Sequence, residues 1–100
     1  MIHEKTFTLE TGRSVKVIAK AQITADKTKV KPEIEVLIKE PRDEDFRPPI
    51  GITHPKYWKL KKLDSQQSKT LQIQYSGITD KQLRKAIREF ERLLIPSHLN

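Results

Sequence analysis

The chain has 100 residues, 35% of them hydrophobic, which suffices for one core and one domain over residues 1–100. Its 33% of charged residues and its lack of a long apolar run exclude a membrane-spanning helix, and the absence of cysteine excludes disulfides and zinc–thiolate sites. The 20 Lys and Arg against 13 Asp and Glu give a net charge of +7, which favours an anionic partner. The opening MIHEKTFTLE lacks an apolar stretch, so we expect no secretory signal and a cytoplasmic location.

Three strands are predicted in the first part of the chain. The first contains Phe7 and Leu9, which alternate with polar residues and precede a turn signal at Thr11-Gly12. The second strand is the clearest, because its apolar residues share one parity: Val15, Val17, Ala19, Ala21 and Ile23. The third strand places its apolar residues on one face in the same way: Ile34, Val36 and Ile38.

The second and third strands are predicted to form an antiparallel hairpin. A turn centred on residues 26–27 (Asp-Lys) places the core residues of one strand opposite those of the other. The predicted partners are Val15 with Ile38, Val17 with Val36, Ala19 with Ile34, and Lys20 with Glu33. The last of these is a favourable cross-strand charge pair.

Apolar residues outside this pattern suggest a surface for a partner. Ile18 and Leu37 fall on the polar face of the hairpin as diagonal neighbours, either shielded by lysine side chains or open to a partner.

Residues 40–55 contain an acidic triplet and four of the 6 prolines, so a long loop is predicted. Within this loop, Phe46 follows the acidic triplet and precedes a proline-rich stretch, as in a short segment that docks on another protein.

The next segment is less clearly patterned. Tyr57, Leu60 and Leu63 recur at helical spacing, which favours a short helix over a strand for residues 55–63. Residues 65–68 are predicted to be a polar connector. A fourth strand is then predicted from three apolar residues that alternate with polar ones: Leu71, Ile73 and Tyr75.

The last element is predicted to be an amphipathic helix. Thr79 and Gln82 form a capping box, with Ile78 and Leu83 placed as a hydrophobic staple. The apolar stripe contains Leu83, Ala86, Ile87, Phe90, Leu93 and Leu94, and Pro96 ends the helix. The predicted fold class is therefore α+β, with a largely antiparallel sheet of three or four strands, a β-β-β-α-β-α order, and the C-terminal helix packed on one face.

No set of residues predicts catalysis. His3, His54 and His98 lie far apart and have no serine, carboxylate or second histidine at ligand spacing. The glycines are isolated, which excludes a glycine-rich phosphate loop, and Arg47 and Pro48 stand where a calcium loop needs a ligand and a glycine. We therefore expect a protein that is not an enzyme and that has no cofactor and no metal site.

Two basic clusters predict binding of nucleic acid or another polyanion. The first lies on the outer face of the last helix: Lys81, Arg84, Lys85, Arg88 and Arg92. The second surrounds Tyr57 and Trp58: Lys56, Lys59, Lys61 and Lys62. Bases stack on aromatic rings and phosphates contact lysines in proteins that bind single strands, so a continuous surface of both clusters would be a binding site. A solvated basic face and a Trp58 buried in the core are the other interpretations.

The alternative function is a protein–protein interaction module or adaptor. Ile18, Leu37 and Phe46 are its candidate contact residues. The partner is an acidic protein or a second copy of the chain, which forms a homodimer through the sheet edge or through the outward apolar patch.

Overall fold

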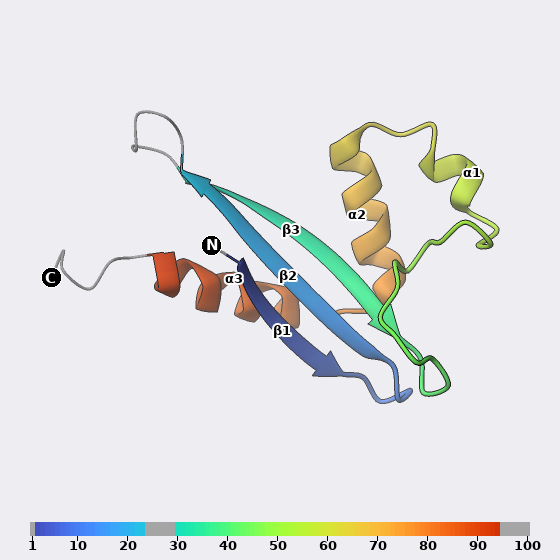
Figure 1. The fold of residues 1–100 in the computed structure, drawn as a ribbon, viewed down its shortest axis with the longest axis horizontal. Coiled ribbons are helices and arrows are strands. Elements are labelled where there is room, and N and C mark those ends of the chain that lie inside the picture. Colours follow the sequence, from blue (N-terminus) through green and yellow to red (C-terminus); the bar gives the residue numbers. More distant parts are fainter. Residues whose placement is uncertain (1, 24–29, 95–100) are drawn as a thin grey trace, which may run out of the picture.

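The computed structural model describes residues 2–23 and 30–94, which form three strands followed by three helices (Figure 1). The strands are β1 (Ile2–Thr8), β2 (Ser14–Ile23) and β3 (Val30–Lys39), and the helices are α1 (Tyr57–Leu60), α2 (Ser65–Ser76) and α3 (Asp80–Leu94). The strands make an antiparallel sheet in the order β1-β2-β3, so the predicted α+β class is confirmed. No helix in these two ranges is both long and apolar enough to cross a bilayer.

The predicted register of the β2–β3 hairpin is confirmed. The observed partners include Val15 with Ile38, Val17 with Val36, Ala19 with Ile34, and Lys20 with Glu33. The ion pair differs in detail, because Lys20 Nζ lies 4.0 Å from Oε2 of Glu35, the diagonal neighbour, on the same face. The predicted turn at residues 26–27 lies outside the described residues.

The core lies on one face of the sheet. Its buried residues from β2 and β3 are Val15, Val17, Ala19, Val36 and Ile38. From α3, Ala86 and Phe90 are buried in the same way, and this helix lies against β1 and β2, whereas α2 lies beside β3 (Figure 1). Both helices cover the same face, since Ile73 of α2 and Leu83 of α3 pack against one cluster. The opposite face is turned away from them.

The start of α3 forms as predicted. The Gln82 amide donates to Oγ1 of Thr79 at 3.1 Å, and the Thr79 amide donates to Oε1 of Gln82 at 3.1 Å, which completes the capping box. The predicted apolar stripe is wrong at Leu93, which is 53% exposed. Pro96, predicted to end the helix, lies outside the described residues.

The predicted fourth strand is wrong, because residues 65–76 form α2. Asp64 caps this helix by accepting a 2.8 Å hydrogen bond from the Gln67 amide, and Gly77 ends it with a left-handed φ of 83°. Ile73 packs on the sheet, while the Tyr75 ring lies 5.5 Å from the His54 ring of the preceding loop. A helix that packs on two sides has no single apolar stripe, so three alternating apolar residues resembled a strand.

The long segment between β3 and α2 packs against the edge of β3 and contains one fully buried residue. The predicted short helix is confirmed as α1, a single turn. Before it, Arg47 forms an isolated bridge with Ile38, with backbone hydrogen bonds of 2.7 and 2.8 Å along the outer edge of β3. Ile50 is then 1% exposed, which fixes the segment at a second point.

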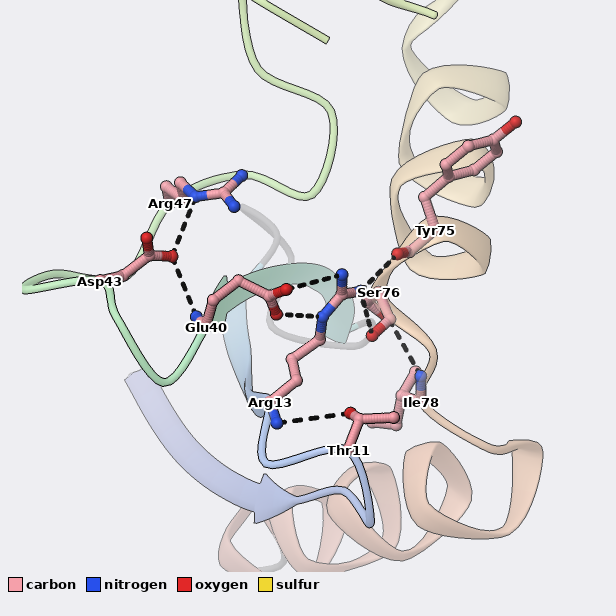
Figure 2. Close-up of polar contacts among 8 residues, drawn as sticks. All are labelled: Thr11, Arg13, Glu40, Asp43, Arg47, Tyr75, Ser76 and Ile78. Carbon is pink, nitrogen blue, oxygen red and sulfur yellow. Dashed lines mark hydrogen bonds and ion pairs between the residues drawn. The ribbon is translucent and has the colours of Figure 1, made fainter. Parts of the chain in front are cut away.

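A polar junction joins the β1–β2 turn, the end of β3 and the end of α2 (Figure 2). The Arg13 guanidinium pairs with the Glu40 carboxylate and donates to the carbonyls of Tyr75 and Ser76 at 2.9 and 3.2 Å. A cation is favourable there because the last carbonyls of a helix are unpaired and carry partial negative charge. Arg13 therefore fixes α2 relative to the sheet.

The loop after β3 begins with a second polar contact, also drawn in Figure 2. Oδ2 of Asp43 accepts from the Glu40 amide at 2.9 Å and from Nε of Arg47 at 3.0 Å. The hydrogen bond from the Glu40 amide is the main reason why the pKa of Asp43 is lowered, and Arg47 lowers it further. This contact holds the chain as it turns back toward the edge of β3.

Candidate nucleic-acid interface

The outer face of α3 carries the first basic cluster. Its five members are all exposed: Lys81, Arg84, Lys85, Arg88 and Arg92. Within the part of the chain that the structure describes, none of these cations lies within ion-pair distance of a carboxylate. They are thus presented to solvent, as an anion-binding surface requires.

Four of these cations line one shallow hollow of about 280 Å³: Lys81, Lys85, Arg88 and Arg92. Their spacing of three and four residues places them on one strip of the helix surface. Arg84 is exposed on the same helix but does not line the hollow. The four lining cations span residues 81–92, which corresponds to about three helical turns along the axis at roughly 5.4 Å a turn.

Glu89 is the acid that lines the hollow, and it is engaged by β1. Its carboxylate accepts a 3.1 Å hydrogen bond from the Lys5 ammonium and lies 3.8 Å from Nε2 of His3. The hydrogen bond from Lys5 is the main reason why the pKa of Glu89 is lowered, and the charge of Lys85 lowers it further. Because Lys5 already neutralises Glu89, this acid does not cancel the cations of the hollow.

His3 and Lys5 were missed as neighbours of this surface. The predicted first strand was argued from Phe7 and Leu9, whereas β1 begins at Ile2 and places His3 and Lys5 on the side of the sheet that faces α3. The His3 ring stacks on Phe90 with centroids 6.2 Å apart, and its Nε2 is buried without a hydrogen-bond partner among the described residues. The period-2 pattern, extended toward the N-terminus, was the signal that could have found them.

The second basic cluster surrounds α1. Its four lysines are all exposed: Lys56, Lys59, Lys61 and Lys62. Trp58 is 60% exposed, so the interpretation that places this ring in the core is wrong. The Lys62 ammonium lies 5.1 Å from the Trp58 ring centroid, and Lys61 lies 5.2 Å from that of Tyr57. These distances allow cation–π contacts.

The two basic clusters do not form one surface. Figure 1 shows α1 at one end of the molecule, beyond α2, while α3 runs under β1 and β2 toward the other end. The molecule extends 47 Å along its longest axis. The prediction of a continuous basic surface was therefore wrong, because α2 and the sheet separate elements that are close in sequence.

The candidate contact residues of the alternative function do share a face. Ile18 and Leu37 are half-buried on the side of the sheet away from the helices, and Phe46 joins them there. The Lys16 ammonium lies 4.2 Å from the Phe46 ring centroid, and Lys16 is the β2 partner of Leu37. Lysine side chains thus shield part of this patch, as one of the two interpretations expected.

The described residues contain no group of three His, Asp or Glu side chains placed to hold a metal ion. No protein-family model matches the chain, and no curated protein and no solved structure matches it either. The charges, contacts and hollows of the structure are therefore what supports a functional proposal.

Proposed function

We propose that this protein is a non-enzymatic domain that binds nucleic acid through the phosphate backbone, using the basic face of α3. The observation that supports the proposal is the row of exposed cations, without carboxylate partners among the described residues, that line one hollow. Phosphate oxygens are strong acceptors for Arg and Lys, and neutralising them releases counterions from the nucleic acid.

The proposed contact recognises the phosphate backbone of the nucleic acid and does not read its bases. The one aromatic residue of α3 is Phe90, which is buried against the sheet, so no ring of this helix can stack on a base. We therefore expect binding that is independent of sequence, with dissociation constants of roughly 1 to 100 µM at physiological salt.

A salt series tests this proposal directly. Fluorescence anisotropy is measured with labelled 20-nucleotide single strands and with the matching duplex. Four phosphate contacts predict that log K falls against log salt with a slope of about −3.6 on duplex and about −2.8 on single strands. Affinity no better than millimolar at low salt would overturn the proposal.

The variant pair Lys85→Ala with Arg88→Ala localises the contact. It removes two of the four cations of the hollow, so the salt slope is expected to fall to about half. The matched control is Lys39→Ala with Arg42→Ala, which removes the same charge at the end of β3 and in the following loop. Equal losses in both variants would show a diffuse effect of net charge. Tighter binding of poly-glutamate than of either oligonucleotide would favour an acidic protein as the ligand.

The alternative function, a protein-interaction module, has a separate test. If the patch of Ile18, Leu37 and Phe46 pairs two copies of the chain, Leu37→Lys dissociates the dimer in sedimentation experiments at high concentration. The control substitution is Lys39→Glu on the same face of β3, which leaves the patch intact. A monomer at all concentrations would contradict the homodimer.

A further inference from the structure

Two large apolar side chains are exposed at the end of the molecule that carries α1. Ile52 is 80% exposed and Trp58 is 60% exposed, and the sequence separates them by only a short segment. Figure 1 shows that α1 lies beyond α2, on the side of this helix away from the sheet. Exposed apolar side chains that lie close together mark an interaction surface.

The chain around these two residues is compact. The His54 amide donates to the Gly51 carbonyl at 2.9 Å, and the Tyr57 amide donates to the His54 carbonyl at 3.0 Å, so two turns follow one another. A turn of this kind keeps its first and last Cα atoms within about 7 Å. Ile52, in the first turn, is therefore held close to α1. We name residues 51–62 the α1 tip.

An apolar pocket of about 660 Å³ adjoins the α1 tip. Ile50, Ile52, Tyr57 and Leu60 are among its lining residues. The Gln72 side chain accepts from the Ile50 amide at 2.7 Å and donates to the Ile50 carbonyl at 3.0 Å, which joins this loop to α2. The apolar surface of the tip thus extends beyond Ile52 and belongs to the folded structure.

The α1 tip is strongly basic. The ammonium groups of Lys61 and Lys62 lie 5.2 and 5.1 Å from the ring centroids of Tyr57 and Trp58, so positive charge lies directly beside both rings. Within the two described ranges, no carboxylate lies within ion-pair distance of the lysines of the tip. Residues 46–63 contain no acid and carry five cations: Arg47, Lys56, Lys59, Lys61 and Lys62.

The acids that flank this segment in the sequence are largely engaged elsewhere. Asp64 accepts from the Gln67 amide at 2.8 Å as the cap of α2. Asp43 accepts from Nε of Arg47 at 3.0 Å, so this pair is neutral. The four lysines of the tip therefore remain available to an anionic partner.

We propose that the α1 tip docks on the surface of a bilayer that contains anionic lipids. Trp58 lies at the level of the headgroups, Ile52 enters the boundary between headgroups and acyl chains, and the lysines pair with lipid phosphates and carboxylates. The contact is with the bilayer surface and needs no spanning helix. This site is separate from the α3 surface, and it does not rest on the proposed nucleic-acid contact.

A bilayer matches this combination of side chains better than nucleic acid does. A base can stack on Trp58, but Ile52, the more exposed of the two, has no counterpart in a phosphate backbone. At a bilayer surface an indole ring and an aliphatic side chain are both favourable, and neighbouring lysines extend their ammonium groups to the headgroups.

The test uses the fluorescence of the whole protein. Trp58 is the single tryptophan of the chain, so its emission reports on the α1 tip alone. The probes are vesicles of phosphatidylcholine with about 30% phosphatidylserine, and vesicles of phosphatidylcholine alone for comparison. With the anionic vesicles we expect a blue shift of Trp58 emission, quenching by brominated acyl chains, and co-sedimentation that high salt weakens by at least about tenfold.

Ile52→Asp is the variant that locates the contact. Because Ile52 is so exposed, the protein should fold, and vesicle affinity should drop about tenfold as an apolar contact is replaced by a charge of the same sign as the lipids. Ile2→Asp is the matched control, since Ile2 is 65% exposed on β1, and its substitution adds the same charge away from the tip. It should leave vesicle affinity within about twofold of the parent.

A second pair of variants separates this inference from the proposed function. Lys59→Ala with Lys62→Ala should weaken co-sedimentation with anionic vesicles at least about tenfold. Lys85→Ala with Arg88→Ala removes the same charge from α3 and should keep the Trp58 blue shift while it loses oligonucleotide binding. Failure of either proposal is therefore visible without the other.

Several outcomes would overturn this inference. They are an unchanged Trp58 emission with anionic vesicles, an equal shift with phosphatidylcholine alone, and equal effects of Ile52→Asp and Ile2→Asp. A larger Trp58 response to a single-stranded oligonucleotide than to vesicles would assign the tip to nucleic acid. An equal blue shift with poly-glutamate would assign it to an acidic protein.

Discussion

The two basic regions of this protein have the same kind of charge and different surroundings. On α3 the cations form a row on a helix whose opposite side contributes buried residues to the core. Around α1 the lysines lie within and on either side of a single helical turn that carries an exposed Trp58. A row of cations on a helix that packs on the core suits a phosphate backbone, whereas the turn that carries the second cluster has no buried residue.

The two basic clusters therefore differ in how firmly the helix beneath them is anchored. α3 is anchored by Phe90, which is 0% exposed, and by the Thr79 capping box. α1 has no buried residue, and no described side chain caps its start. The following changes test this contrast, starting with the largest expected effect.

Stability should depend strongly on the aromatic residue of α3 and hardly on that of α1. Phe90→Ala leaves a cavity between α3 and the sheet and is expected to lower the free energy of unfolding by about 3–5 kcal/mol. Trp58→Ala removes a ring that is 60% exposed, so the change should stay within about 0.5 kcal/mol. Urea unfolding followed by circular dichroism measures both. Similar losses for the two variants would contradict the packing described for α3.

The starts of the two helices provide a second contrast. Thr79→Ala removes the acceptor for the Gln82 amide and is expected to cost about 1 kcal/mol of unfolding free energy. At α1, Lys56→Ala removes a side chain that makes no capping hydrogen bond to the described residues, so little change is expected. The same urea experiment checks this. A Thr79→Ala protein as stable as the parent would show that the cap contributes nothing measurable.

Oligonucleotide binding should distinguish the two basic clusters, because equal charge can be removed from each in turn. Lys59→Ala with Lys62→Ala removes as much charge from the second basic cluster as the α3 double variant removes from the hollow. If α3 holds the phosphates, this α1 variant should change oligonucleotide affinity by no more than about twofold at 0.15 M salt, because distant charges are screened. Anisotropy with the labelled single strand is the measurement. A loss equal to that of the α3 variant would transfer the interface to α1 or to both clusters.

The smallest expected effect is a pH dependence from Glu89. Its pKa in the folded protein is lowered from the ordinary value of 4.5, chiefly by the Lys5 hydrogen bond, so the folded state favours the ionised form. The resulting stability is present above pH 4.5 and is lost as the pH falls through the folded pKa. Unfolding free energies from pH 6 to pH 3 should therefore fall more for the parent than for Glu89→Gln. Parallel curves would contradict the Lys5–Glu89 contact, with Glu91→Gln as the exposed control.

The hairpin register and the start of α3 were predictable because local rules determine them. A period of two residues, together with short connections, leaves one register in which buried residues face each other, and Val17 lies opposite Val36 as expected. The capping box needs only Thr79 and Gln82, three residues apart. α2 was not predictable in this way. Its apolar residues contact the sheet on one side and the loop at His54 on the other, so its pattern lacks a single period.

The amino-acid sequence was enough to predict the α+β class, the sheet of paired strands, the amphipathic last helix and the cations on its outer face. These follow from side-chain periodicity and from capping chemistry, which act over a few residues. The packing of the elements in three dimensions places the two basic clusters apart (Figure 1) and brings Lys5 against Glu89. Such relations depend on how elements far apart in sequence pack together, and no local pattern encodes the distance between them.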